Sequence, residues 1–305
     1  MIWIYTSIIL FIFQFETINP KPATYLFVLG IAQDGGYPHA GCQRADCQKL
    51  FSTGKKGHLV SCIAIVDKAS KQSWLIDATP DFPGQLELLE KTTGTKLAGI
   101  FLTHAHIGHY TGLMHLGREV MGAKQMPVYA MPRMQLFLEQ NGPWSQLIQL
   151  QNIVIQPIVA DSFVTLTPHL KIKPLLVPHR DEFSETVGYQ IESLNKKVIF
   201  IPDINKWNLW DQDITSVIQK VDIALLDGTF YQNEEIPGRD MKEIPHPFIE
   251  ESMELFTTLS ATNKAKIHFI HINHTNPLMQ KGSAAQKNVR RAGFKIAWEG
   301  QRIEL

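Results

Sequence analysis

Hydrophobic residues along the chain fall into short runs that predict buried strands and into spaced positions that predict amphipathic helices. Strands are expected at residues 24–30, 61–66, 73–76, 98–102, 128–130, 187–191, 197–201, 222–226, 266–272 and 294–298. Helices are expected at residues 82–91, 113–121, 133–140, 214–219, 247–259 and 280–291, and an antiparallel meander at residues 154–177. Strands come first as hairpins and later alternate with helices, twice over, which is consistent with two sheets packed face to face and helices outside.

The first residues of the chain are apolar and carry no charge before Glu16, and Pro20 and Pro22 end this stretch. An apolar run of about 15 residues is shorter than the ~20 that a transmembrane helix needs, and it suits the core of a secretory signal. We therefore expect an exported protein, periplasmic or extracytoplasmic, or one attached to the membrane through residues 1–22. A mis-assigned start, with a cytoplasmic protein, and a buried first helix are the alternatives. Residues 23–305 are then the catalytic domain.

The composition restricts the classes of partner. The 305 residues are 44% hydrophobic and 19% charged, which suits one large globular domain or two small ones with a sizeable core. The formal net charge is zero, so a basic surplus for general nucleic-acid binding is lacking, and a small-molecule substrate is expected. Three cysteines are too few for a disulfide scaffold. A homodimer stays open.

Three histidines, His104, His106 and His109, directly follow the apolar run at residues 98–102. The first two can project into one pocket at the end of the strand, and His109 can turn back toward them as a helix begins. Neutral imidazole is the commonest nitrogen ligand of zinc, and a catalytic zinc typically has three protein ligands and an open position for water. The stretch therefore predicts a metal site, with a histidine-rich solvent loop as the alternative.

This stretch resembles the His-x-His-x-Asp-His signature of the metallo-β-lactamase fold, whose members are mostly metal-dependent hydrolases. The resemblance implies an α/β (α+β) architecture, an αββα sandwich of two mixed sheets with helices outside. Gly108 stands where the family usually has an aspartate that helps to hold a second metal. A site with one metal is therefore an alternative, and Asp34, in the loop after the first strand, is a candidate replacement.

Other polar residues follow apolar strands in the order of the family's remaining motifs. The resemblance implies a first metal held by His104, His106 and His179, a second held by His109 and His271, and a bridging Asp203. Asp77 occupies the position of an early aspartate that orients the histidine loop. Zn²⁺ is the expected ion, as one or two catalytic metals, and Fe²⁺ or Mn²⁺ is the alternative.

A second segment indicates which branch of the family the chain resembles. Asp227, Gly228 and Thr229, followed by His246 at a helix start, resemble the segment in which phosphodiesterases of this fold place a catalytic histidine. The resemblance implies that His246 binds the scissile phosphate or protonates the leaving oxygen, beside the catalytic Asp203. An exposed histidine at a helix N-terminus is the alternative.

Cys42 and Cys47 lie where the phosphodiesterase of phosphonate breakdown and protein B of pyrroloquinoline quinone synthesis carry a Cys-x-Cys-x-x-Cys motif. In the phosphodiesterase this motif binds a structural zinc together with a histidine shortly after the last catalytic histidine, the position that His274 takes here. The resemblance implies a structural zinc on Cys42, Cys47, His274 and His39. A Cys42–Cys47 disulfide and two unpaired thiols are the alternatives.

Residues 24–305 as a whole resemble the pyrroloquinoline quinone protein B group, which is close to these phosphodiesterases. Hydrolysis of a phosphodiester or similar ester by a metal-bound hydroxide is the first hypothesis, because His246 and Asp203 suit it. The rival is an iron-dependent oxygenase that acts on a peptide or quinone precursor, which a single metal with open positions would favour. A non-catalytic exported binding protein is the third hypothesis.

Overall fold

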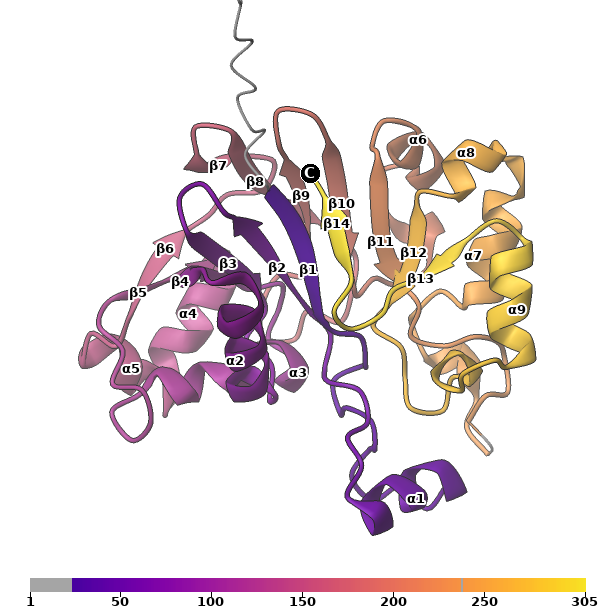
Figure 1. The fold of residues 1–305 in the computed structure, drawn as a ribbon, viewed down its shortest axis with the longest axis horizontal. Helices are drawn as coiled ribbons and strands as arrows, with labels where there is room; N and C mark the ends of the chain where they lie inside the picture. Colours follow the sequence, from indigo (N-terminus) through magenta and orange to yellow (C-terminus); the bar gives the residue numbers. More distant parts are fainter. Residues whose placement is uncertain (1–23, 237) are drawn as a thin grey trace, which may run out of the picture.

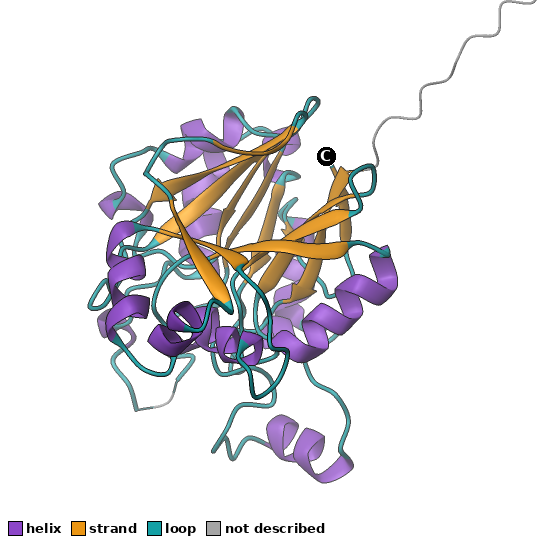
Figure 2. Cartoon of the chain, turned by 90° about the vertical axis from the view of Figure 1, so that its left-hand side faces the viewer, coloured by secondary structure: helices purple, strands orange, loops and turns teal. Residues whose placement is uncertain are grey.

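Two mixed β-sheets lie face to face at the centre of the molecule, with helices on their outer sides (Figure 1, Figure 2). The computed structural model describes residues 24–236 and 238–305. The first sheet has the order β14-β1-β2-β3-β4-β5-β6, with β1 Thr24–Gly30, β2 Cys62–Asp67, β3 Gln72–Ile76, β4 Lys96–Phe101, β5 Met126–Ala130, β6 Ile153–Pro157 and β14 Arg302–Glu304. The second has the order β13-β12-β11-β10-β9-β8-β7, with β7 Val164–Thr167, β8 Leu170–Leu176, β9 Val187–Glu192, β10 Lys197–Ile201, β11 Ile223–Asp227, β12 Ile267–Ile270 and β13 Lys295–Ile296.

The helices divide between the two sheets. On the side of the first sheet lie α2 Phe82–Thr93, α3 Ile107–Tyr110, η1 Thr111–Leu116, α4 Pro132–Gln140 and α5 Trp144–Gln149. The chain of the second sheet contributes η2 Trp207–Leu209, α6 Ile214–Gln219, η3 Met241–Glu243, α7 Ile249–Leu255, η4 Phe256–Thr258, α8 Ala261–Lys264, η5 Pro277–Met279 and α9 Ala284–Arg291. Helix α1 Ala45–Thr53 stands apart at the bottom of Figure 1.

Three buried apolar layers hold these elements together. Phe101, Tyr189 and Phe200 belong to the layer between the sheets. A second layer lies between the first sheet and its helices, and a third between the second sheet and its helices. Successive side chains of a strand point to opposite faces, so each sheet contributes to two layers. The predicted sandwich is confirmed.

Two local predictions are wrong. The helix expected at residues 113–121 is the 3₁₀ helix η1, Thr111–Leu116, followed by turns. An ideal Cβ on Gly112 would lie 2.1 Å from the carbonyl oxygen of Thr79, so the chain passes that loop too closely for a side chain at this position. The meander expected at residues 154–177 is split, because β6 pairs parallel with β5 in the first sheet while β7 and β8 pair in the second.

Candidate metal centre

Strands of both sheets end at one edge of the sandwich, and the predicted metal ligands lie there. Strands β10, β11 and β12 are parallel, so their carboxyl ends share that edge. The side chains of the centre are Asp34 after β1, Asp77 after β3, His104, His106 and His109 after β4, His179 after β8, Asp203 after β10, Asp227 in β11 and His271 after β12.

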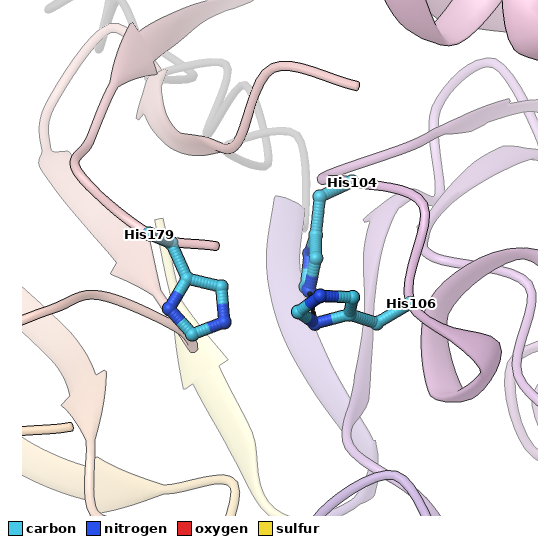
Figure 3. Close-up of side chains that lie close together, drawn as sticks. All are labelled: His104, His106 and His179. Atoms are coloured by element: carbon cyan, nitrogen blue, oxygen red, sulfur yellow. Dashed lines mark hydrogen bonds between the residues drawn. The ribbon is translucent and has the colours of Figure 1, made fainter. Parts of the chain in front are cut away.

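The first group of ligands consists of His104, His106 and His179, whose ligand atoms lie within 4.8 Å of one another. His104 Nε2 and His106 Nδ1 are 2.8 Å apart. The ring of His179 lies 5.4 Å from the ring of His104 and 5.1 Å from that of His106. Figure 3 shows the rings of His104 and His106 close together, with the ring of His179 facing them from the other side. Three imidazoles therefore converge on one position.

The second group consists of His109, His271 and Asp34. Asp34 Oδ1 lies 2.9 Å from His109 Nε2 and 3.3 Å from His271 Nε2. Asp203 Oδ2 lies 3.2 Å from each of these two nitrogens, while its Oδ1 lies 3.7 Å from His179 Nε2. The carboxylate of Asp203 therefore faces both groups, which is the position that a bridging ligand requires.

Two threonine hydroxyls fix the orientation of the histidine rings. Thr103 Oγ1 donates to Asp77 and lies 3.0 Å from His104 Nδ1. Thr229 Oγ1 donates to Asp227 and lies 3.0 Å from His271 Nδ1. Because each hydroxyl hydrogen points to a carboxylate, the hydroxyl oxygen accepts from the Nδ1–H of the histidine, and Nε2 keeps a lone pair for a metal.

The other rings are held in the same way. His109 Nδ1 donates to Asp77 Oδ2 at 2.7 Å, and His179 Nδ1 lies 3.3 Å from Asn205 Oδ1. The backbone φ angles of Asp77 and His271 are positive, at 73° and 62°. Non-glycine residues in this region carry strain that the surrounding structure must hold in place, and such residues cluster at functional sites.

The donor set fits a divalent cation. Burial lowers the pKa of His104 well below its usual value and the pKa of His179 to about 4, so both rings are neutral and able to act as ligands. Within the described residues, His179 Nε2 and Asp203 Oδ2 are buried and make no hydrogen bond. An unpaired buried polar atom costs about 1–3 kcal/mol. A cation in the first group would satisfy His179 Nε2, and a cation in the second group would satisfy Asp203 Oδ2.

His246 lies beside the centre, where its Nδ1 is 2.7 Å from Asp227 Oδ2 and 3.9 Å from Asp203 Oδ1. Its ring lies 5.0 Å from the ring of His179. Burial opposes the charged form, but the carboxylates of Asp227 and Asp203 raise the pKa of His246 above its usual value. The side chain is 7% exposed, so it is not the exposed helix-end histidine of the alternative interpretation.

Three residues of the centre carry no role in the sequence interpretation: Asp227, Thr229 and Asn205. Asp227 is the last residue of β11, which is parallel to β10, and Asp203 follows β10. The position of Asp227 at the common edge of these two strands was the signal that could have assigned it to the centre. Thr229 and Asn205 orient histidine rings through hydrogen bonds, and a sequence pattern does not show such contacts.

Three of the four predicted ligands of a structural zinc, His39, Cys42 and Cys47, follow β1 in the chain, and the fourth is His274. The four ligands lie less close together than the ligands of the histidine centre. The rings of His39 and His274 stack with their centroids 4.2 Å apart. Cys42 and Cys47 are buried and free of a disulfide. Burial, together with a hydrogen bond that the Cys47 thiol makes to Cys42, raises the pKa of Cys47 to about 11. In the described part of the chain, every group of three ligand atoms within 4.8 Å of one another belongs to the histidine centre. The structural zinc stays a prediction.

Comparisons with known proteins agree with this geometry. Residues 73–269 match the family described as Beta-lactamase superfamily domain. Coenzyme PQQ synthesis protein B of Klebsiella pneumoniae is 28% identical over 312 residues, which cover 92% of this chain and 98% of the relative. Zn²⁺-bound PqqB from Methylobacterium extorquens has a TM-score of 0.74 at 21% identity, covering 92% of this chain and 100% of that chain. A diphosphatase from the PhnP family has a TM-score of 0.61 at 22% identity, covering 92% and 97%. These two structures share the fold.

One prediction is corrected by the comparisons. The N-terminal apolar segment, residues 1–22, led us to expect an exported protein, and that segment lies outside the described residues. The relatives that match along 91–92% of this chain are named for the synthesis of a coenzyme, not for an exported role. Among residues 24–236 and 238–305, every helix is too short or too polar to cross a membrane. The prediction of export is wrong, because a short apolar run without a positive start and a cleavage site is weak support for a signal.

Proposed function

Because the chain belongs to the beta-lactamase superfamily, we propose that it is a metal-dependent hydrolase that cleaves a phosphodiester or a similar ester bond. The observation that carries the proposal is the contact between His246 Nδ1 and Asp227 Oδ2 at 2.7 Å, beside the two groups of metal ligands. A protonated imidazole next to a metal centre can complete a hydrolysis that the centre begins.

The ligands of the centre form two sets, one for each metal. His104, His106 and His179 would hold one metal, His109 and His271 would hold the other, and Asp203 faces both groups. A bound divalent metal lowers the pKa of its water from ~15.7 to about 7 and so supplies a nucleophile at neutral pH.

His246 then acts on the leaving group. Asp227 accepts from Nδ1, so Nε2 holds the proton that passes to the leaving oxygen as the ester bond breaks. Asp227 is itself fixed by Ile204 N, which donates to the same Oδ2 at 3.1 Å. The imidazole therefore keeps one orientation.

The rim of the centre favours a small substrate with an apolar part. Ile107 follows His106 and is 62% exposed, and Phe183 is 61% exposed. Phe183 lies next to Glu182, whose Oε2 is 3.7 Å from His106 Nε2. Two exposed apolar side chains thus lie next in sequence to His106 and to Glu182, and they can contact the non-reacting part of an ester.

Hydrolysis of bis-p-nitrophenyl phosphate tests this function. We expect His246→Gln to lower kcat by about 10²–10⁴-fold, with the metal content per chain unchanged, because His246 acts on the leaving group. His115→Gln is the matched control, since His115 lies in η1, its ring stacks on Phe82 of α2, and it belongs to neither group of metal ligands. Equal loss in both variants, or full activity in His246→Gln, would contradict the proposal.

A second function is favoured by the likeness to coenzyme PQQ synthesis protein B along 92% of this chain. His109, His271 and one carboxylate form the two-histidine, one-carboxylate set that non-haem iron oxygenases use. In that case the protein would be an iron-dependent oxygenase acting on a peptide or quinone precursor. Iron-dependent oxygen consumption, together with inert phosphodiesters, would favour this function over hydrolysis.

A further inference from the structure

Asp34 reaches the metal centre from a part of the chain far from the histidine motif. Its Oδ1 lies 2.9 Å from Nε2 of His109, a residue 75 positions later, and 3.3 Å from His271 Nε2. The loop that carries it is tied to the loop of His271, because Gln33 N donates to Ile272 O at 2.9 Å and Ile272 N donates to Ile31 O at 2.7 Å. The position of Asp34 is therefore built into the fold.

The loop that carries Asp34 packs against the histidine motif at Gly108. An ideal Cβ on Gly108 would lie 2.5 Å from Asp34 Cα and 2.6 Å from Asp34 Oδ1. Gly108 lies in the helix α3, in a conformation that any residue adopts, so its backbone does not require glycine. The approach of Asp34 is the physical reason for a glycine here. A side chain at position 108 and Asp34 in its present place exclude each other.

We infer that Asp34 is a ligand of the second metal and takes the place of the carboxylate that the histidine motif lacks at Gly108. This inference rests on the metal centre of the proposed function. With Asp34, the second group offers two imidazole nitrogens and one carboxylate of its own, and it shares Asp203 with the first group. Four donors of these types would suit a divalent metal.

The substitution changes which part of the chain the metal holds. A carboxylate at position 108 would be a second ligand from the histidine loop after β4, beside His109. Asp34 ties it to the loop after β1 as well, which pairs with the chain around His271. With Asp34, the loops after four strands, β1, β4, β10 and β12, each contribute one ligand to the second metal. Gly108 therefore does not imply a site with one metal.

Metal content and affinity test the inference without reference to activity. Wild-type protein, Asp34→Asn and Asp34→Ala are loaded with Zn²⁺, desalted and measured for metal per chain by mass spectrometry, and each is titrated with a chelator. We expect both variants to lose one metal per chain, or to bind the weaker metal at least about 100-fold less tightly, since the loss of outer hydrogen-bond partners alone costs ~10–100-fold. Asp211→Asn, an exposed carboxylate, is the matched control.

Gly108→Ala is a second, independent variant. A methyl group here meets Asp34 Cα at 2.5 Å and must displace the Asp34 loop, so the same metal is expected to be lost although every ligand side chain is retained. Circular dichroism shows whether the variant is folded, and the Asp34 variants decide the question if it is not. Unchanged metal content and affinity in Asp34→Asn and Asp34→Ala would overturn the inference. A wild-type protein that binds both metals but cleaves no ester would refute the proposed function and leave the inference standing.

Discussion

Asp77 Oδ2 accepts a hydrogen bond from His109 Nδ1 at 2.7 Å, and both side chains are fully buried. Asp77 Oδ1 also accepts from Thr103 N at 2.8 Å. One carboxylate therefore holds the histidine loop at its start and at its last histidine. It directs His109 Nε2 toward Asp203 and Asp34.

The loss of this carboxylate should weaken the second metal. Asp77→Asn keeps the shape of the side chain, and asparagine tolerates the positive φ of this position. We expect the affinity for one metal to fall by about 10–100-fold because the amide no longer fixes the ring of His109. Chelator competition measures the affinity, with Asp211→Asn as the control. An affinity within about 2-fold of the wild type would show that Asp77 only supports the fold.

Tyr189 connects the second sheet to the histidine loop. Its hydroxyl donates to Leu102 O at 2.6 Å across the layer between the sheets. We expect Tyr189→Phe to lower the free energy of unfolding by about 1–3 kcal/mol, because the carbonyl of Leu102 stays buried without this donor. Tyr129→Phe, with its ring part-exposed and stacked on Phe101, is the matched control and should cost less. Urea unfolding of both variants measures the difference, and equal costs would contradict the role of the hydrogen bond.

Much of the sandwich was predictable because its strands are apolar runs. The histidines His104, His106 and His109 were recognisable because their spacing after such a run is local. The 3₁₀ helix Thr111–Leu116 was not, since Leu113 and Leu116 are buried as the pattern of a longer amphipathic helix predicts. The close approach of Gly112 to the carbonyl of Thr79 depends on tertiary packing, which the pattern does not show. The edge strand β14 has three residues and pairs only with β1, which leaves no pattern to detect.

The ligand contributed by Asp34 shows a different limit. A motif compares each position with its counterpart, so Gly108 registers as a missing ligand. The sequence offers Asp34 only as a candidate replacement, because it lies 75 positions away from His109 and the packing of the loop after β1 brings it there. A glycine that is not needed for its backbone conformation indicates that another part of the chain lies close to it.

His268 should make the stability of the protein depend on pH. It lies at the sheet interface, where Gln301 Nε2 donates to its Nδ1 at 3.2 Å. Burial, with the nearby charge of Lys295, lowers the pKa of His268 to about 4 in the folded protein. The pKa in the unfolded chain is about 6.5, so between these values the unfolded chain binds a proton that the folded protein does not.

Stability is therefore fully present above pH ~6.5 and falls as the pH falls toward about 4. At pH ~5 we expect His268 to cost about 1–2 kcal/mol relative to pH 7. Other buried histidines titrate too, so the measured quantity is the difference in pH dependence between the wild type and His268→Gln in urea unfolding. The variant should lose less stability on acidification. Parallel pH profiles would contradict the assignment.

The cysteines provide the last prediction. Cys42 and Cys47 are buried thiols, and the rings of His39 and His274 stack near them. If these four residues hold a structural zinc, Cys42→Ala should lower the zinc content by one per chain and leave the chelator titration of the histidine centre unchanged, because none of the four belongs to that centre. Cys62→Ala, a buried thiol in β2, is the matched control and should keep every metal.

A structural zinc stabilises the fold when bound, so Cys42→Ala should also lower the melting temperature of the zinc-loaded protein, while chelator-treated wild type and variant should melt together. Equal zinc content in Cys42→Ala and Cys62→Ala would show that the two thiols are unpaired core residues. In that case Cys47 is a neutral thiol beside Cys42, as its raised pKa indicates.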